Sequence, residues 1–433
     1  MTETTPYWHD AAPPEPASGQ IPPARVEIAI VGAGFTGLNA ARGLAEAGRE
    51  VALFEAGPPG AGASTRNGGM LGWGHRITLA GLSRRHGRDR AEAILSEARR
   101  SLDYTTDLIA DLPGETGYAH TGRFLGAASP RHYRDLARWA EEEAPALGME
   151  VELIPRAEQS RHIASDLYHG GVHFTQHAAV HPALMHRALL RATRAAGARI
   201  YDHCPVETVS GTPGAWRIRH PHGVTEAGEL VYAANGYTGG PKGPFRAFAR
   251  RLMPIPSYII ATEPLGENRM RALIPSGANI VETRATHSYF RPSPDGTRLI
   301  YGGRASLNVL DEGRATARMR QIMLSVFPDL AGTAITHSWR GFVAFTFDGI
   351  PHTGQLEGIW YAAGYNGSGV AMAPYLGHRL AQKILGREEA RTAFDPTPFR
   401  SQPFYNGTPW FLRGVEMWMK AKDRWQGVRQ PRA

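Results

Sequence analysis

Apolar runs and helical spacings alternate near the start of the chain and predict a strand, a helix and a second strand. Residues 26–31 (VEIAIV) form a mostly apolar run, which is typical of a buried strand in a parallel sheet. Residues 39–47 continue an apolar pattern with helical spacing and stop at Gly48, a residue that commonly ends helices. Residues 50–54 form the next apolar run. This order predicts a βαβ unit.

Similar patterns recur along the chain, with strand-rich and helical segments between them. Further helices are expected over 91–110, 131–147, 181–196 and 370–385. Further strands are expected over 198–201, 258–261, 280–283, 288–291, 299–301 and 359–363, with an antiparallel ribbon from 216–219 and 230–233. The turn Pro294-Asp295-Gly296 is expected to join two of these strands as a hairpin. The pattern predicts an α/β protein with two discontinuous domains.

Composition excludes several classes of protein. The chain has 433 residues, 42% hydrophobic and 20% charged, which excludes a disordered chain and a disulfide-stapled miniprotein. The net charge is +8, but the arginines are spread along the whole chain, so no nucleic acid partner is expected. The single cysteine, Cys204, suits a reducing compartment. The polar, proline-rich start lacks signal-peptide features and no run is long enough to span a membrane, so we expect a cytoplasmic protein without integral membrane contact.

The turn after the first strand carries a dinucleotide-binding pattern. Gly32-Ala33-Gly34-Phe35-Thr36-Gly37 fits G-x-G-x-x-G between a strand and a helix, and Glu55 follows the second strand. Gly32 permits the tight turn, Gly34 allows close approach of a pyrophosphate, and Gly37 allows close packing of helix and strand. The helix N-terminus attracts the phosphates, and Glu55 accepts hydrogen bonds from the ribose.

Two further segments favour FAD over NAD. The first is the loop Ser64-Thr65-Arg66-Asn67-Gly68-Gly69-Met70, whose hydroxyls, arginine and glycines suit a pyrophosphate and a flat isoalloxazine ring. The second is the turn Gly364-Tyr365-Asn366-Gly367-Ser368-Gly369-Val370, which leads from a strand into a helix. The start of that helix is expected beside the flavin edge where negative charge develops on reduction.

These motifs, together with His181-Pro182 and Ala233-Ala234-Asn235-Gly236, resemble the D-amino-acid oxidase superfamily of FAD-dependent oxidoreductases. Within it, the chain is most similar to the gamma-glutamylputrescine oxidase-like branch. The resemblance implies a GR2-type Rossmann-like FAD-binding domain and a mixed or antiparallel-sheet substrate domain. It also implies that Val206 meets the adenine and that Ala234 and Gly236 close on the pyrophosphate side.

The resemblance also implies a division of the chain. An extended arm is expected over 1–24, the FAD-binding domain over 25–82, 150–245 and 335–390, and the substrate domain over 83–149 and 246–334. Residues 391–433 are expected to pack on the FAD-binding domain. Some relatives attach FAD to a cysteine where this chain has Ala344, so we expect non-covalent FAD. The same relatives use a lysine to activate oxygen, and no lysine lies between Lys242 and Lys383.

Three residues are candidates for catalysis, and no metal site is expected. His75 follows the flavin loop, while Tyr258 and Arg304, together with Tyr289, lie on or beside strands expected to roof the ring. Arg304 offers a fork for a substrate carboxylate or a positive charge for oxygen. The resemblance implies oxidation of a primary or secondary amine, polyamine-derived or amino-acid-like, with O2 giving hydrogen peroxide. A homo-oligomer is possible. Three alternatives stay open: an amino-acid dehydrogenase that reduces a quinone, a tRNA-modifying flavoenzyme and a non-catalytic flavin-binding protein.

Overall fold

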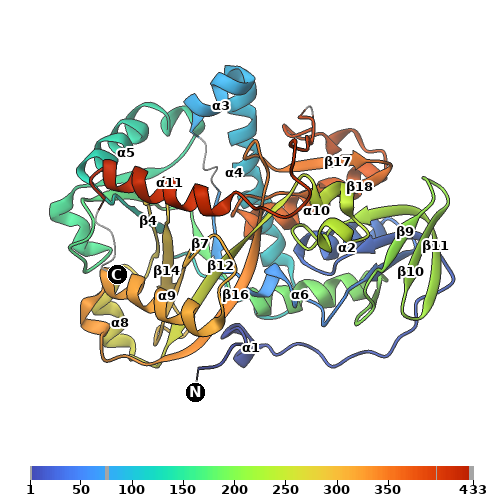
Figure 1. Ribbon diagram of the computed structural model, residues 1–433, viewed down its shortest axis with the longest axis horizontal. Coiled ribbons are helices and arrows are strands. Elements are labelled where there is room, and N and C mark those ends of the chain that lie inside the picture. Colours follow the sequence, from blue (N-terminus) through green and yellow to red (C-terminus); the bar gives the residue numbers. More distant parts are fainter. Residues whose placement is uncertain (1, 74–77, 396, 429–433) are drawn as a thin grey trace.

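The computed structural model describes residues 2–73, 78–395 and 397–428, and its strands form two large sheets (Figure 1). The first sheet has the strand order β17 (His352–Leu356), β18 (Ile359–Ala363), β11 (Gly223–Tyr232), β1 (Arg25–Val31), β2 (Val51–Phe54) and β8 (Arg199–Tyr201). Its central pairs are all parallel, from β18 through to β8. β9 (Thr208–Ser210) and β10 (Trp216–His220) extend it as an antiparallel ribbon on β11.

The first sheet is buried on both faces because its strands are apolar at successive positions. Ile28 and Ile30 share a core with the helices α2 (Phe35–Glu46), α4 (Arg88–Asp111), α6 (Pro182–Ala195) and α10 (Gly369–Ile384). Ala29 lies in a second core, which also includes Trp216 of β10 and Phe248 of α7 (Arg246–Ala249). Alternate residues of a strand point to opposite faces, so a buried strand contributes side chains to both cores.

The second sheet is mixed and mostly antiparallel. Its strand order is β16 (Ile335–Phe345), β12 (Met253–Thr262), β15 (Leu299–Gly303), β14 (Ser288–Pro292), β13 (Asn279–Glu282), β4 (Arg123–Gly126), β6 (Gly171–Phe174) and β5 (Val151–Ile154). Helices α8 (Glu267–Leu273) and α9 (Glu312–Val326) cover one face, where Met270, Met319 and Met323 share a core with Ile260. The predicted hairpin is confirmed as β14 and β15. The strands β3 (Met70–Leu71) and β7 (Ala178–Ala179) form a small separate pair.

The expected arm over 1–24 is corrected at its start. Glu3 pairs with His337 of β16 as a parallel bridge, and residues 8–11 form the short helix α1 (Trp8–Ala11). The Trp8 side chain is fully buried and packs edge to face on Trp339 and His181. A proline-rich, polar composition gave no sign that one tryptophan anchors the segment in the core.

The strand pairings also differ from the predicted boundaries. β5, β6 and β16 belong to the second sheet, although 150–245 and 335–390 were expected in the FAD-binding domain. The helix α4, expected in the substrate domain, shares the core of α2 and α10. The last described helix, α11 (Leu412–Trp425), contacts Ala285 and Ser306 of the second sheet's loops, while Phe399 packs on Tyr361 of the first sheet. The residue boundaries of the two predicted domains therefore stay a prediction.

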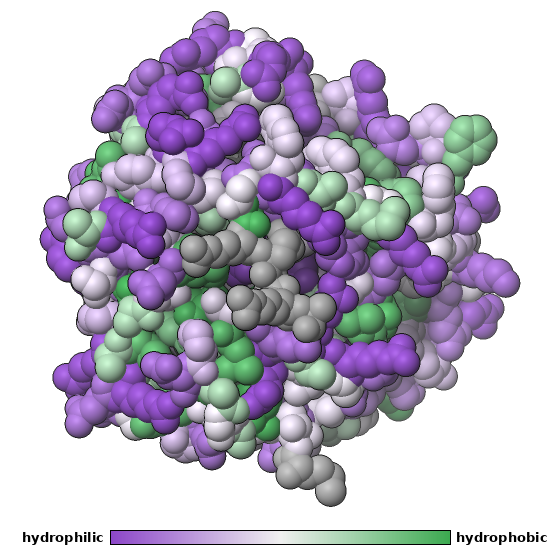
Figure 2. Space-filling model, turned by 60° about the vertical axis from the view of Figure 1, so that its left-hand side comes forward, coloured by the Kyte–Doolittle hydropathy of each residue, from purple (hydrophilic) through white to green (hydrophobic). Residues whose placement is uncertain are grey.

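The remaining helices, α3 (Leu79–His86) and α5 (Pro130–Glu142), lie above the second sheet in Figure 1. Figure 2 shows one face of the molecule, on which hydrophilic residues predominate and hydrophobic residues form separate patches. Within the described part of the chain, none of the helices combines the length and the apolar character needed to cross a membrane.

Candidate active site

A glycine turn joins β1 to α2 and packs closely against the loop that carries Ser64. Gly32 has a φ of +104°, a conformation that favours glycine. A Cβ on Gly37 would lie 1.9 Å from the carbonyl oxygen of Gly32, so the helix start packs directly on the turn. A Cβ on Gly34 would lie 2.9 Å from Ser64 Oγ, and that hydroxyl accepts a hydrogen bond from the Phe35 N–H at 3.0 Å. The turn is therefore shaped by close backbone approach.

Glu55 stands at the end of β2 and faces the same turn. Its Oε2 accepts a hydrogen bond from the Ala33 N–H at 2.8 Å, and its Oε1 accepts one from the Gly57 N–H at 3.3 Å. Burial raises the pKa of this carboxyl, and these backbone N–H groups only partly offset the effect. An ionised carboxylate has further lone pairs, which suit the hydroxyls of a ribose.

A cavity of about 490 Å³ runs between the N-termini of α2 and α10. Gly34 and Phe35 line it from α2, and Gly369 and Val370 line it from α10. Neither helix has an acidic residue in its first turn. The positive ends of two helix dipoles therefore meet the cavity without an acidic side chain in either first turn, which suits a ligand with anionic groups.

Many of the predicted cofactor residues are brought to this cavity. Those that line it are Gly32, Gly34, Phe35, Thr36, Glu55, Ser64, Asn67, Val206, Ala234, Asn366, Gly367, Gly369 and Val370. Those that do not line it are Gly37, Thr65, Arg66, Gly68, Gly69, Met70, Gly236, Gly364 and Ser368. Several of the second group shape the backbone around the cavity instead.

The loop after Glu55 is held by its own side chains. Asn67 Nδ2 donates to the carbonyl of Ser64 at 2.9 Å, and Asn67 Oδ1 accepts from the Gly69 N–H at 2.8 Å. Thr65 Oγ1 donates to the carbonyl of Gly60 at 2.6 Å, and Arg66 Nε donates to a neighbouring carbonyl at 2.8 Å. Thr65 and Arg66, expected to wrap a pyrophosphate, are thus used to fold the loop.

Two tryptophans brace this loop from outside. The indole N–H of Trp8 donates to the Asn67 carbonyl at 2.8 Å, and that of Trp339 donates to the Arg66 carbonyl at 3.1 Å. A Cβ on Gly341 of β16 would lie 3.2 Å from Arg66 Cβ, so the second sheet presses directly on the loop. The N-terminal segment therefore supports the cavity, a contribution that its sequence did not indicate.

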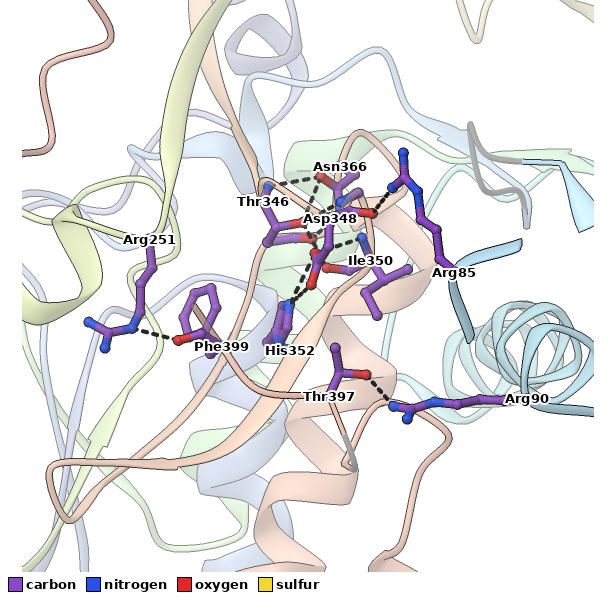
Figure 3. A network of polar contacts seen from close by, with 12 residues as sticks. Arg85, Arg90, Arg251, Thr346, Asp348, Ile350, His352, Asn366, Thr397 and Phe399 are labelled. Carbon is purple, nitrogen blue, oxygen red and sulfur yellow. Dashed lines mark hydrogen bonds and ion pairs between the residues drawn. The ribbon is translucent and has the colours of Figure 1, made fainter. Parts of the chain in front are cut away.

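A polar network fixes the turn between β18 and α10, and Figure 3 shows it. Asn366 has a φ of +52°, its Oδ1 accepts from the Thr346 N–H at 3.0 Å, and its Nδ2 donates to the Gly364 carbonyl at 2.6 Å. Thr346 Oγ1 donates to the carbonyl of Ile350 at 2.9 Å. Burial acts to raise the pKa of Asp348, but the hydrogen bond and charge of His352 outweigh it and leave the pKa below its ordinary value.

Replacing Asn366 by alanine is expected to lower both cofactor affinity and thermal stability. The variant loses two buried hydrogen bonds and keeps a left-handed backbone, for a combined cost of about 2 kcal/mol. The measurement is a thermal melt with and without added cofactor. Glu357→Ala is the matched control, because Glu357 also has a positive φ, of +53°, but is exposed and lies away from the cavity. If Asn366→Ala and Glu357→Ala lost equal melting temperature and equal stabilisation by the cofactor, the left-handed backbone alone, and not the Asn366 hydrogen bonds, would explain the effect.

The loops after β8 and β11 close the other end of the cavity. Pro205 and Val206 line it, while the neighbouring Cys204 is fully buried in the core beneath. Burial, with smaller contributions from the negative charges of Asp202 and Glu207, raises the pKa of the Cys204 thiol to about 11. Cys204 therefore packs as a small apolar side chain.

The Cys204 thiol is expected to be inert in the folded protein. At about pH 8, roughly one thiol in a thousand is ionised when the pKa is about 11, and burial blocks access as well. A coloured thiol reagent is expected to report almost no reaction in native buffer and one thiol per chain after denaturation, since the chain has one cysteine. Rapid stoichiometric labelling of the native protein would contradict the buried position.

The second sheet covers the cavity through β16. Phe342, Val343 and Ala344 line it, and Phe342 meets Tyr237 edge to face with ring centroids 6.0 Å apart. Sequence reasoning missed the role of Tyr237, which follows the Ala233–Gly236 motif directly. Asn235 was part of a predicted motif, but its contact was not foreseen: its Oδ1 accepts from the Gly364 N–H at 2.9 Å and so joins two of the predicted motifs.

The three catalytic candidates have different outcomes. His75 lies outside the described residues. Tyr258 is corrected: its ring lies in the core under α9, and its hydroxyl accepts from the Leu310 N–H at 2.8 Å and donates to the Asn308 carbonyl at 3.1 Å. It faces away because neighbouring strand residues alternate in direction. Arg304 follows β15 and lies over the ring of Phe345, at 5.0 Å, without lining the cavity.

Tyr289, which was expected on the roof together with Tyr258, does lie on the side of the sheet that faces the loop Gly68-Gly69. Its ring packs over Gly68, where a Cβ would lie 2.9 Å away, and its hydroxyl is 2.9 Å from Ser257 Oγ. Burial raises the pKa of Tyr289, and the hydrogen bond to Ser257 and the charge of Arg304 act in the opposite direction. Ser257, Tyr289 and Arg304 therefore form a polar group behind the loop Gly68-Gly69.

The cavity fits a flavin dinucleotide. A carboxylate for ribose, two helix N-termini free of first-turn acids, and glycines where a Cβ would collide all lie around one space. Ser64 and the Gly34–Thr36 backbone would hold the pyrophosphate, and the Gly364–Gly369 turn would lie beside the reducible ring.

Comparisons with known proteins agree with this geometry. The family described as DAO, FAD dependent oxidoreductase, matches residues 27–383. The chain is 31% identical over 391 residues to the probable oxidoreductase OrdL of Rhizobium meliloti (strain 1021), covering 88% of each chain. It is 29% identical over 382 residues to gamma-glutamylputrescine oxidoreductase of Escherichia coli (strain K12), again covering 88% of each. Glycine oxidase from Geobacillus kaustophilus has the same fold, with a TM-score of 0.71 at 21% identity over 88% of this chain and 99% of that one.

These findings confirm the predicted α/β fold, the predicted cofactor FAD and the predicted enzyme class. The family match begins in β1, two residues after the start of that strand, and ends within α10. It therefore includes both helix N-termini and all three motifs that surround the cavity. From its sequence, its fold and its cavity, the chain belongs to the family of FAD-dependent oxidoreductases.

Proposed function

We propose that this enzyme oxidises a primary or secondary amine, polyamine-derived or amino-acid-like, and that O2 is its electron acceptor. The amine would lose two electrons and two protons as its C–N single bond becomes C=N, and O2 would gain them as hydrogen peroxide. The observation that carries the proposal is the cavity at the N-termini of α2 and α10, which β16 of the second sheet covers. The similarity to gamma-glutamylputrescine oxidoreductase of Escherichia coli supports the choice of an amine.

The chain's residues would supply binding and electrostatics, while bound FAD would supply the two-electron chemistry. The first turn of α10, with Gly369 and Val370 at the cavity, would stabilise the negative charge that reduction brings to its neighbourhood. Phe342 and Tyr237 would exclude water from one side of the cavity. Tyr289 and Arg304 are the polar groups we propose on the substrate side, with Ser257 orienting the Tyr289 hydroxyl.

We also propose that FAD is held without a covalent bond. The one cysteine, Cys204, is buried in the core beside Val206 and does not line the cavity. Ala344, which does line the cavity, has no thiol that could bond to FAD. Precipitating the protein with acid is expected to release all the yellow colour into solution. Colour that stays with the precipitate would contradict a non-covalent site.

One observation favours a second candidate, an amine or amino-acid dehydrogenase that passes its electrons to a quinone. The sequence has no lysine between Lys242 and Lys383, a stretch that includes β12, β14, β15 and β16. If the enzyme is an oxidase, another cation must activate O2 in place of that lysine. We propose Arg304, because its positive charge acts on the neighbouring Tyr289 at the sheet that covers the cavity.

Measuring peroxide and oxygen uptake per amine oxidised separates the two candidates. An oxidase is expected to consume one O2 and release one peroxide for each amine, and Arg304→Gln is expected to slow reoxidation by air more than it slows reduction by the amine. Arg314→Gln, at an exposed arginine of α9, is the control. Full reduction by the amine with negligible reoxidation in air, restored by an added quinone, would establish the dehydrogenase instead.

A further inference from the structure

The helix α11 turns its acidic residues inward. Asp423 is fully buried, and its Oδ1 accepts from the Ala285 N–H at 2.9 Å. Glu416 Oε2 accepts from the Ser306 hydroxyl at 2.9 Å and from the Leu307 N–H at 3.1 Å. These are the two acidic residues of the helix. Both hold α11 against the second sheet, which it crosses in Figure 1.

The outward side of the same helix is apolar and aromatic. Met417, Trp418 and Trp425 are 70%, 62% and 75% exposed, and Trp410, just before the helix, is 69% exposed. With Phe404, these residues are five of the nine large hydrophobic side chains that are exposed in the described part of the chain. Ala421 lies between Trp418 and Trp425 at helical spacing, so the exposed residues form one stripe. An exposed aromatic stripe of this kind marks an interaction surface.

Cations flank the stripe. Arg413, Lys422 and Arg424 are exposed, and Lys422 Nζ lies 5.4 Å from the ring centre of Trp418. Arg131 of α5 lies over Trp425 at 4.8 Å and adds a further positive charge to the same surface. Because Glu416 and Asp423 face inward, the outward side of α11 carries positive charge without an acid of its own.

We propose that this surface, the outward side of α11 with Trp410, binds an anionic lipid bilayer. Tryptophan favours the boundary between lipid headgroups and acyl chains, and lysine and arginine are attracted to anionic headgroups. The helix would lie in the plane of the bilayer surface without crossing it. A second copy of the chain fits this surface less well, since a two-fold contact would place the cations of α11 opposite themselves.

Co-sedimentation of the full-length holoenzyme with vesicles tests the proposal. Vesicles of phosphatidylcholine with phosphatidylglycerol are expected to bind the enzyme, and vesicles of phosphatidylcholine alone are expected to leave it in solution. Binding is expected to weaken as sodium chloride screens the charges. The triple variant Arg413→Gln, Lys422→Gln, Arg424→Gln is expected to lose affinity on the order of a hundredfold.

The charge control removes as many exposed cations elsewhere. Arg217→Gln, Arg271→Gln and Arg314→Gln change three exposed arginines that are distant from α11 in the sequence, and they are expected to leave binding nearly unchanged. All variants are expected to keep the FAD content and the amine oxidation rate of the parent, which shows that they are folded. Equal loss of binding in both triple variants would overturn a specific surface in favour of general charge attraction.

A second pair of variants tests the aromatic stripe. Trp418→Ser with Trp425→Ser is expected to weaken binding on the order of tenfold and to reduce quenching by brominated lipids. Ile21→Ser with Val309→Ser, at residues that are 68% and 57% exposed, is the control. Failure to bind anionic vesicles above the neutral background would overturn the proposal. A dimer in sedimentation velocity that becomes a monomer only in the tryptophan variant would assign the surface to a second copy instead.

Discussion

Replacing Gly37 by alanine is expected to weaken FAD binding by about 10- to 100-fold, the largest effect of any single methyl group in this site. The new Cβ would lie 1.9 Å from the backbone oxygen of Gly32, which cannot rotate away. The helix start must move, and overpacking of this kind costs about 1–3 kcal/mol. That movement displaces the Gly34–Thr36 backbone, where the pyrophosphate would bind.

Titrating apoprotein with FAD and following flavin fluorescence measures the effect. Gly43→Ala is the matched control, because Gly43 lies on the same helix and its Cβ would be 3.3 Å from a side-chain methyl of Ala381. Alanine also favours helix at that position by up to about 1 kcal/mol. If Gly37→Ala bound FAD as tightly as Gly43→Ala, the close packing of turn and helix would not matter for the cofactor.

Replacing Glu55 by glutamine is expected to weaken FAD binding by about tenfold or more. Hydrogen bonds to a charged group are worth about 1.5–3 kcal/mol, and the variant loses the one negative charge that holds the Ala33 N–H and would also meet the ribose hydroxyls. Glu50→Gln, at an exposed carboxylate on the neighbouring loop, is expected to bind FAD normally. The measurement is the dissociation constant at neutral pH.

The pH dependence of FAD binding gives a second, independent readout of Glu55. Burial disfavours the charged form of this carboxyl and so raises its pKa above the ordinary value of 4.5. The contribution of Glu55 to apoprotein stability is therefore lost as pH rises through the raised value. A ribose that donates to the carboxylate favours the charged form. FAD affinity is therefore expected to fall as pH drops through the raised pKa in the parent, and to stay flatter in Glu55→Gln. Identical profiles would contradict this role.

The FAD-binding core could be predicted because its signals are local. The strand β1, the glycine turn, the helix α2 and Glu55 follow one another within a short stretch, and each leaves a periodic or compositional mark. The turn at Gly364–Gly369 and the hairpin of β14 and β15 were predictable for the same reason. The family resemblance then joined segments that lie far apart in the sequence.

The direction of side chains could not be predicted from residue type. Thr65 and Arg66 have suitable groups for a pyrophosphate, but both donate to nearby carbonyls. In β12, Ser257 faces the loop of Gly68 through Tyr289, and so its neighbour Tyr258 must face the opposite core. A shift of one residue in the pairing of a strand turns each side chain to the opposite face of the sheet, so only the register of β12 shows which face Tyr258 occupies. The anchoring of Trp8 depends on contacts with Trp339, far away in the sequence.

The most direct test of the account is an anaerobic titration of the purified protein. We expect one FAD per chain, and bleaching of its visible absorption by polyamines, acylated polyamines or N-methyl amino acids. The parent would be reduced by one such class of amine, and apoprotein prepared from Gly37→Ala would take up FAD poorly. A protein that is colourless and fails to take up FAD would contradict the central claim, and a flavin that no amine reduces would contradict the proposed reaction.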